Sequence, residues 1–379
     1  MSDRLIGRLN PQSFLPTPEQ QLLLNACLLD GEDAIASWRL WRAQVNFDHI
    51  DLGSIRLLPL LADNLNRLNV KDPSFGIYRG VKRRTWARNQ MLYSGAATIV
   101  GRLQAAGISV LALKGMVLAL SYYKQMSLRP MGDVDVLVKR NDRVKALDQL
   151  ERLGWRLQSP QRPRDAADFA IRHACAFEDP SNSEVSVDLH WRLLWMQDSE
   201  DAEAALWSRA VALEFDRTHC LAPCAADMLI HVCAHGARWN DFPPLRWIVD
   251  ALLLLRSHNV DWTYLREQSA RLRLDLQLAD SLTYLHDVMR APIPREILAD
   301  LANSEARPIE RLLYQAELHP PEKRSLVTAL RIHWHIARQQ LSRSEGIYGY
   351  WRYFVALCAG RSVREIAGWT RRKLIDGVR

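Results

Sequence analysis

The stretch from Ile108 to Val138 constrains the fold of this chain more than any other. The apolar run over residues 108–113 predicts a buried strand, and the Lys114-Gly115 pair that follows it predicts a tight turn. The next apolar residues predict a helix to about Gln125, and the run after Pro130 predicts a second strand. The region is therefore expected to fold as strand, helix, loop and strand.

Two aspartates, Asp133 and Asp135, are placed one residue apart on the second of these strands. Side chains on a strand alternate between its two faces, so both carboxylates are expected on the same face. Two like charges held side by side repel each other unless a cation lies between them. Because Mg²⁺ prefers oxygen ligands, the pair predicts a magnesium site.

The turn at Lys114 and Gly115 predicts a position for phosphate. The first amides of a helix favour anions, and the ammonium group of Lys114 adds a positive charge at the same place. A phosphate seat followed by metal-binding carboxylates is the order expected of a nucleoside triphosphate site.

A third carboxylate, Asp188, lies in the segment from Val185 to Trp191, where apolar and polar residues alternate. The alternation predicts a strand with Asp188 and His190 on its polar face. A metal-binding pair of carboxylates with one further carboxylate is the set that runs an in-line displacement at phosphorus.

Three motifs in a fixed order carry a resemblance to a known family: Lys-Gly at the start of a helix, R-x-x-x-D-x-D over residues 129–135, and VDLHW over residues 187–191. The sequence resembles the uncharacterised bacterial nucleotidyltransferases of the DNA polymerase beta superfamily, whose first helix opens with Lys-Gly where other branches have Gly-Ser. The resemblance covers roughly residues 103–191 and, more loosely, residues 231–250. It implies an α+β fold, with a small mixed sheet and flanking helices embedded in a largely helical protein.

The resemblance implies that the three acidic residues are catalytic and hold metal. Asp133 and Asp135 would bind two Mg²⁺ ions, and Asp188 would complete the shell of one ion and help to deprotonate the acceptor. The implied reaction moves a nucleoside monophosphate from an NTP to a hydroxyl-bearing acceptor and releases pyrophosphate. The acceptor stays open between a small molecule, a peptide, a protein and an RNA, because a fold does not dictate its substrate.

The same resemblance implies which residues hold the triphosphate. Lys114, with the amides of Gly115 and Met116, would bind the β- and γ-phosphates. Arg129 would neutralise negative charge on the triphosphate during transfer. These four residues are the predicted nucleotide-binding set.

The remainder of the chain predicts mostly helices, in four parts. These are an N-terminal helical region at 1–80, a nucleotidyltransferase core at 81–195, a helical domain closing the cleft at 196–300, and a C-terminal helical region at 301–379. Within the core, residues 169–177 predict a strand. From about Glu200 onward the pattern predicts helices throughout.

The charge balance favours anionic partners. With 50 basic and 43 acidic residues the formal net charge is +7, which suits nucleotides, nucleic acid or a membrane surface. No apolar run approaches the ~20 residues of a membrane-spanning helix, and the N-terminal residues lack the apolar region of a secretory signal. The six cysteines have no framework spacing, which fits a reducing compartment. We therefore expect a cytoplasmic protein.

Two clusters admit more than one interpretation. The basic run Lys82–Arg84 with Arg88 could contact an acceptor or nucleic acid, although a solvated helix face explains it more simply. His231 and His235 are four residues apart, hence on one helical face, and they are either a satisfied core pair or part of the cleft. Zinc binding with the nearby cysteines at 220, 224 and 233 is disfavoured, because their spacing fits no usual zinc pattern.

The C-terminal part is rich in aromatic and basic residues, from Tyr348 to Phe354 and again from Arg361 to Arg379. Such residues suit a membrane surface or an acidic partner. Ordinary helix packing with a basic terminus is the simpler interpretation.

Two other functions stay open beside the enzyme. One is a non-catalytic nucleotide-binding or assembly module that keeps the fold without turnover. The other is a toxin-like enzyme that modifies a protein or a tRNA, for which acceptor binding would depend steeply on salt.

Overall fold

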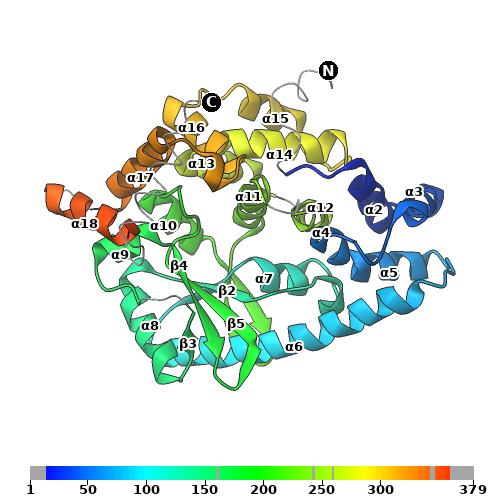
Figure 1. Ribbon diagram of the computed structural model, residues 1–379, viewed down its shortest axis with the longest axis horizontal. Helices are drawn as coiled ribbons and strands as arrows, with labels where there is room; N and C mark the ends of the chain where they lie inside the picture. The colour runs from blue at the N-terminus through cyan, green and yellow to red at the C-terminus, as the bar shows by residue number, and fades with distance from the viewer. Residues whose placement is uncertain (1–13, 159–161, 241–243, 258–259, 342–345, 359–379) are drawn as a thin grey trace.

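The computed structural model describes residues 14–158, 162–240, 244–257, 260–341 and 346–358. In these residues a seven-stranded sheet of parallel and antiparallel strands is surrounded by helices (Figure 1). The predicted α+β fold, a mixed sheet with flanking helices in a largely helical chain, is confirmed. The N-terminal residues 1–13 and the basic segment from Arg361 to Arg379 lie outside the described residues.

The sheet has the strand order β3-β4-β5-β2-β1-β7-β6. Its strands are β1 (Val110–Ala112), β2 (Val134–Val138), β3 (Arg156–Leu157), β4 (Ala174–Asp179), β5 (Asn182–His190), β6 (Val211–Phe215) and β7 (Thr218–Ala222). Two of the pairings, β2 with β5 and β1 with β7, are parallel, and the other four are antiparallel. The sheet extends beyond residue 195, so a core that contains all of it reaches at least to Ala222.

The helices surround this sheet in the order of the chain. They are α2 (Pro18–Leu28), α3 (Gly31–Gln44), α4 (Leu52–Ile55), α5 (Leu58–Arg67), α6 (Phe75–Ala105), α7 (Lys114–Ser121), α8 (Arg143–Arg152), α9 (Ala166–Ile171), α10 (Glu200–Ser208), α11 (Ala225–Gly236), α12 (Arg246–Ser257), α13 (Trp262–Leu272), α14 (Asp275–Asp287), α15 (Arg295–Ala302), α16 (Pro308–Glu317), α17 (Leu326–Gln340) and α18 (Gly346–Cys358). The described residues also form the short 3-10 turns η1 (Met126–Leu128), η2 (Arg140–Asp142) and η3 (Pro321–Lys323).

The long helix α6 supports the sheet and leads directly into it. It contacts β1, β2, β5 and β7, and its buried side carries Ala96, Ile99, Val100 and Leu103 at the three- and four-residue spacing of one helical face. The helix ends before Gly107, whose φ of +74° is the left-handed conformation that glycine adopts at little cost.

The other helices form three groups in Figure 1. Helices α2 to α5 pack on one another and on α6 at the right of the view, and α11 contacts α7, α12, α13 and α14 above the sheet. Helices α17 and α18 pack against α9 at the left, around a second hydrophobic core that includes Met196, Ile336 and Tyr353. The sheet and the C-terminal helices thus have separate cores.

The predicted strand at 169–177 is wrong in its first half. Residues Ala166–Ile171 form α9, whose N-cap Asp165 accepts a hydrogen bond from the amide of Asp168. Strand β4 begins only at Ala174. The apolar residues of this segment belong partly to α9 and partly to β4. Asp165, which caps the start of the helix, was not recognised as a cap in the sequence.

The prediction of helices throughout from Glu200 onward is also wrong. Helix α10 is followed by the hairpin of β6 and β7, which adds two strands to the edge of the sheet beside β1. Its turn consists of Asp216 and Arg217, with φ of 41° and 60°. A hairpin turn with two positive φ angles usually contains glycine or asparagine, and neither residue is present at this turn to indicate it.

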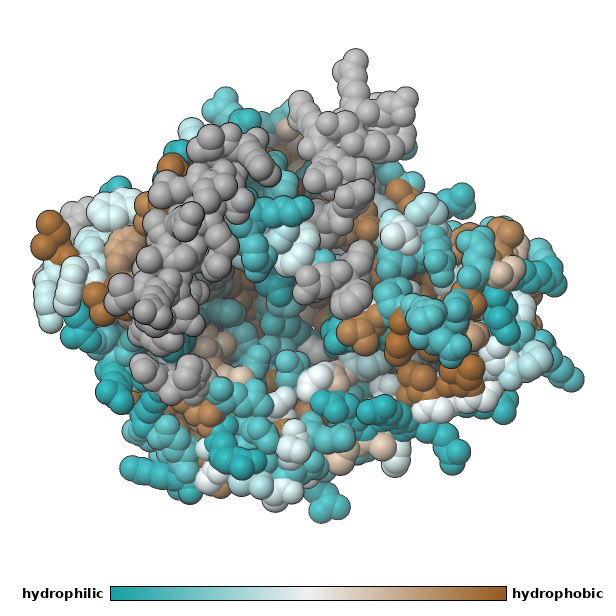
Figure 2. All heavy atoms as spheres, viewed as in Figure 1, coloured by the Kyte–Doolittle hydropathy of each residue, from teal (hydrophilic) through white to brown (hydrophobic). Residues whose placement is uncertain are grey.

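The face of the molecule in Figure 2 is mostly hydrophilic. Hydrophobic side chains gather at the right of the view, around α4 and α5, and a few lie at the left edge formed by α18. There Ile347, Trp351 and Val355 are exposed. In the part of the chain that the structure describes, no helix combines the length and the apolar character needed to cross a membrane.

A glycine-to-alanine pair tests the close packing of α11 on α12. A Cβ at Gly236 would lie 2.1 Å from Cγ of Trp247, whereas a Cβ at Gly101 in α6 would meet no atom within 4 Å. We expect Gly236→Ala to lower the free energy of unfolding by about 1–3 kcal/mol through overpacking. The control Gly101→Ala should raise it slightly, by about 0.5–1 kcal/mol. Urea unfolding measures both, and equal stability of the two variants would contradict this packing.

Candidate active site

The three predicted carboxylates lie together where β2 and β5 run side by side. These strands are parallel, and their register pairs Asp135 with Asp188. Asp133 directly precedes β2 and is exposed. All three line one cavity of about 570 Å³. The sequence patterns at 133–135 and 185–191 thus converge on one place, although they are separated by about fifty residues.

Asp135 is the most buried of the three and contacts two side chains. Its Oδ1 accepts a hydrogen bond from Nζ of Lys114 at 3.0 Å and lies 3.0 Å from Nε2 of His190. Burial alone would raise the pKa of Asp135, but the Lys114 ammonium and the His190 imidazole hold it well below its usual range. Asp135 is therefore a charged carboxylate in the interior of the cleft.

The other two carboxylates have the opposite shift. Burial, with the charges of Asp133 and Asp135, raises the pKa of Asp188 to about 6. Partial desolvation in the cleft, followed by the charge of Asp135, also raises the pKa of Asp133, although its side chain still reaches solvent. Three acidic groups that disfavour one another's charge form a site that a cation stabilises.

The donor atoms of this cluster fit a divalent cation. Among the described residues, Asp135, Asp188 and His190 offer ligand atoms that all lie within 4.8 Å of one another. Carboxylate oxygens suit Mg²⁺ and Ca²⁺, and an imidazole nitrogen beside them also suits transition metals. His190 was predicted on the polar face of its strand but not as a site residue. The signal that would have found it is its two-residue spacing from Asp188, which puts both on the same face.

Helix α7 begins at the edge of this cluster. The amide of Leu113, its N-cap, donates to the backbone carbonyl of Asp135 at 2.9 Å, which ties the start of the helix to β2. Lys114 has a positive φ of 37°, and at Gly115 a Cβ would lie 2.9 Å from Nη1 of Arg129. The first amides of α7 therefore lie beside two cationic side chains. The side chain of Met116 is buried in the hydrophobic core, so its amide is the part that faces this turn.

The loop before Asp133 is held by α6. Arg88 donates from Nε to the carbonyl of Met131 at 3.2 Å and from Nη2 to the carbonyl of Gly132 at 3.1 Å. The side-chain amide of Asn89 donates to the carbonyls of Met126 and Arg129. One member of the basic cluster on α6 thus positions the aspartate loop, a role that its charge did not reveal in the sequence. Lys82, in the same cluster, pairs with Asp63 at 2.7 Å.

Arg129 forms a buried ion pair with Asp250 of α12. Its Nε and Nη2 donate to the two carboxylate oxygens at 2.8 and 2.7 Å, and both side chains are at most 7% exposed. The hydroxyl of Tyr123 also donates to Asp250 at 2.6 Å. The predicted phosphate ligand is therefore anchored on its far side, while its Nη1 lies beside Gly115.

Helix α11 supplies histidines to the opposite wall of the cleft. His231 and His235 both line the cavity, and Nη2 of Arg238 lies 3.0 Å from Nε2 of His235. His231 is only 1% exposed, and within the described part of the chain neither of its ring nitrogens has a hydrogen-bond partner. Of the two interpretations of this pair, the structure favours cleft residues over a satisfied core pair.

The buried ion pair gives a stability test. Asp250→Asn removes the charge that compensates Arg129 and should lower the free energy of unfolding by about 3–5 kcal/mol. The control Arg39→Gln breaks a pair with Glu32 in which both side chains are more than 60% exposed, and it should change stability by less than about 1 kcal/mol. Denaturant unfolding compares the two. An effect of Asp250→Asn as small as that of the control would contradict the burial of this pair.

The buried histidine gives a pH test. Burial, and to a smaller extent the charge of Lys114, holds the pKa of His231 well below its ordinary value of 6.5. The unfolded chain therefore takes up a proton near pH 6.5 that the folded chain does not, and stability falls as the pH drops below that value. We expect His231→Phe to keep the stability at pH 7 and to reduce the loss below pH 6.5 by up to about 1.4 kcal/mol per pH unit.

The measurement for His231 is urea unfolding at several pH values. His49→Phe, at an exposed position, is the matched control and should leave the acid slope unchanged. An acid slope of His231→Phe identical to that of the natural protein would contradict the buried, neutral imidazole.

Comparisons with known proteins show which protein family this chain belongs to. No curated protein matches its sequence. A crystal structure of an antigenic nucleotidyltransferase-like protein from Paracoccidioides brasiliensis is similar over 51% of this chain and 92% of that chain, with 13% sequence identity and a TM-score of 0.33. The model of a family described as uncharacterised nucleotidyltransferase matches residues 54–290, which include the sheet and the cleft. The chain belongs to this family of uncharacterised nucleotidyltransferases.

Proposed function

We propose that this protein is a Mg²⁺-dependent nucleotidyltransferase that moves a nucleoside monophosphate from an NTP to a hydroxyl-bearing acceptor. The observation that carries the proposal is the parallel register of β2 and β5, which sets Asp135 beside Asp188. Asp133 and the start of α7 lie in the same cavity. Carboxylates beside a helix N-terminus are what a metal-bound triphosphate requires.

The transfer is an in-line displacement at the α-phosphorus. The acceptor oxygen forms a new bond to this phosphorus, the bond from it to the α–β bridging oxygen breaks, and pyrophosphate leaves with the electron pair. Asp188 takes the proton of the acceptor hydroxyl. A carboxylate at this position can accept the proton as a general base.

Asp133, Asp135 and Asp188 would hold two Mg²⁺ ions, with His190 beside them. When bound, these ions lower the pKa of the attacking hydroxyl and stabilise the charge of the leaving pyrophosphate. His190 contacts Asp135 through Nε2 and would orient this carboxylate. Each carboxylate therefore has a role that its amide analogue cannot supply.

The triphosphate would bind at the start of α7. Lys114 would contribute its ammonium group, Gly115 and Met116 their amides, and Arg129 the Nη1 that lies beside Gly115. Asp250 fixes the orientation of Arg129 before any ligand arrives. A preorganised charge of this kind costs little reorganisation when the phosphate binds.

A non-catalytic nucleotide-binding module is the second candidate. It is favoured by one observation, namely that Lys114 and His190 already contact Asp135 in the structure. Binding of NTP without release of pyrophosphate would support this module, and release that depends on Mg²⁺ and an acceptor would support the enzyme.

The carboxylates provide the decisive variants. Asp135→Asn and Asp188→Asn should each reduce NTP-dependent labelling of the acceptor by about a hundredfold or more, because the variant loses charge stabilisation in the transition state. The measurement is transfer of label from the α-phosphate of each NTP, with Mg²⁺, to the components of a cell extract. The control Glu214→Gln removes an exposed carboxylate of the same sheet and should keep full activity. Full labelling by Asp135→Asn would refute the metal assignment.

A further inference from the structure

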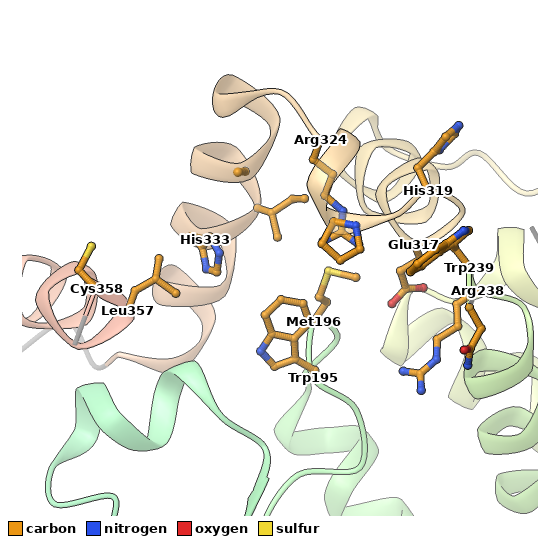
Figure 3. A pocket seen from close by; sticks show the side chains of 14 residues that line it. Trp195, Met196, Arg238, Trp239, Glu317, His319, Arg324, His333, Leu357 and Cys358 are labelled. Carbon is orange, nitrogen blue, oxygen red and sulfur yellow. The ribbon is translucent and has the colours of Figure 1, made fainter. Parts of the chain in front are cut away.

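A second cavity, of about 500 Å³, lies beside the proposed nucleotide cleft. One wall is the segment at 195–196 together with residues 238–240, and the other comes from the C-terminal part of the chain, from Glu317 to Cys358 (Figure 3). Its size is that of a small-molecule site rather than of a surface for a macromolecule.

Two indole rings form the flat parts of this cavity. Trp195 is fixed by a hydrogen bond from its Nε1 to the carbonyl of Ile171 at 3.2 Å, and its ring packs edge-on against His333 at 6.1 Å between centroids. The backbone amide of Trp239 donates to the carbonyl of Glu317 at 2.7 Å. A fixed aromatic face such as that of Trp195 binds the apolar face of a ring compound at a low cost in conformational entropy.

Charged groups surround these rings. In Figure 3 the carboxylate of Glu317 lies between Arg324 above it and Arg238 below it, with Met196 to its left. Burial raises the pKa of Glu317, and Gln277, Arg238 and Arg324 oppose that rise. Gln277 donates to its Oε2 at 3.3 Å, and Arg324 is held by the carbonyl of Ala316 at 3.0 Å. Among the charged side chains that line the cavity there are thus two guanidinium groups and one carboxylate, and Glu322 adds a negative charge near Arg324.

Arg238 connects this cavity to the cleft. It lines both of them, and its Nη2 contacts His235 on the cleft wall at 3.0 Å. A compound that fills the second cavity and reaches Arg238 therefore lies at the border of the space that holds the carboxylates.

We propose that the second cavity binds the acceptor, and that this acceptor is a small hydroxylated ring compound with a negatively charged substituent. The indoles take the ring face, Glu317 accepts hydrogen bonds from hydroxyl groups, and the two arginines bind the anionic group. The inference rests on the proposed nucleotidyl transfer. Of the residues that would recognise the acceptor, Trp195, Arg238 and Trp239 lie within the family match at 54–290, whereas Glu317 and Arg324 lie beyond it.

The test fills the cavity from α17. Ala329 lines it, whereas its neighbour Leu330 is 47% exposed. Ala329→Trp should reduce transfer of label from the NTP to the dialysable fraction of a cell extract by about tenfold or more, because a displaced acceptor loses its alignment. The matched control Leu330→Trp should transfer at the rate of the natural protein. Both variants should bind NTP and Mg²⁺ with unchanged Kd.

A second variant changes charge without changing size. Glu317→Gln should raise the amount of dialysable fraction needed for half-maximal transfer, again with unchanged binding of NTP. This variant keeps the test open if Ala329→Trp proves unstable in thermal unfolding. The mass of the labelled product should correspond to a nucleoside monophosphate joined to a hydroxylated, anionic ring compound.

The possible failures are distinguishable. Transfer at the natural rate by Ala329→Trp and Glu317→Gln would overturn the cavity assignment and leave the proposed function intact. Label found only in protein or RNA, or on a neutral compound, would also overturn the acceptor assignment. Absence of transfer by the natural protein with every NTP would overturn the proposed function and this inference with it.

Discussion

The parallel pairing of β2 with β5 is the constraint on which the rest of the site depends. It sets Asp135 beside Asp188 and thereby creates a concentration of negative charge that the fold has to balance. Lys114, at the start of α7, and His190, two residues beyond Asp188, supply that balance on Asp135. Because β1 pairs with β2, the start of α7 is placed beside the same carboxylates. The register of β2 and β5 thus determines where the carboxylates of Asp135 and Asp188 lie, and also which side chains compensate their negative charge.

The helices around the sheet contribute to the site by positioning the loop before Asp133 and by forming the opposite wall of the cleft. Helix α6 fixes the segment before Asp133 through Arg88 and Asn89, and α11 supplies the opposite wall through His231. These contacts join residues far apart in the chain. They explain why a short strand motif forms a defined site only inside a much larger helical protein, in which buried polar groups find partners from several elements.

Local patterns in the sequence predicted those features that depend on neighbours in the chain. The alternation of apolar and polar residues around Asp135 and Asp188 predicted the two strands that carry them. The pairing of β6 with β7 was missed because Asp216 and Arg217 adopt positive φ without glycine. The partner of Arg129 is Asp250, 121 residues away, and no spacing rule reaches that far. Long-range partners are set by packing, which a single sequence does not display.

The bidentate ion pair of Arg129 with Asp250 links two parts of the chain that line the cleft. Arg129 belongs to the segment that enters β2, and Asp250 belongs to α12. The hydroxyl of Tyr123 donates a further hydrogen bond to Asp250. Separating these two parts would leave a guanidinium and a carboxylate buried without their partners, which has a high cost in free energy. A hinge that separates these two parts is therefore the least favourable way to open the cleft.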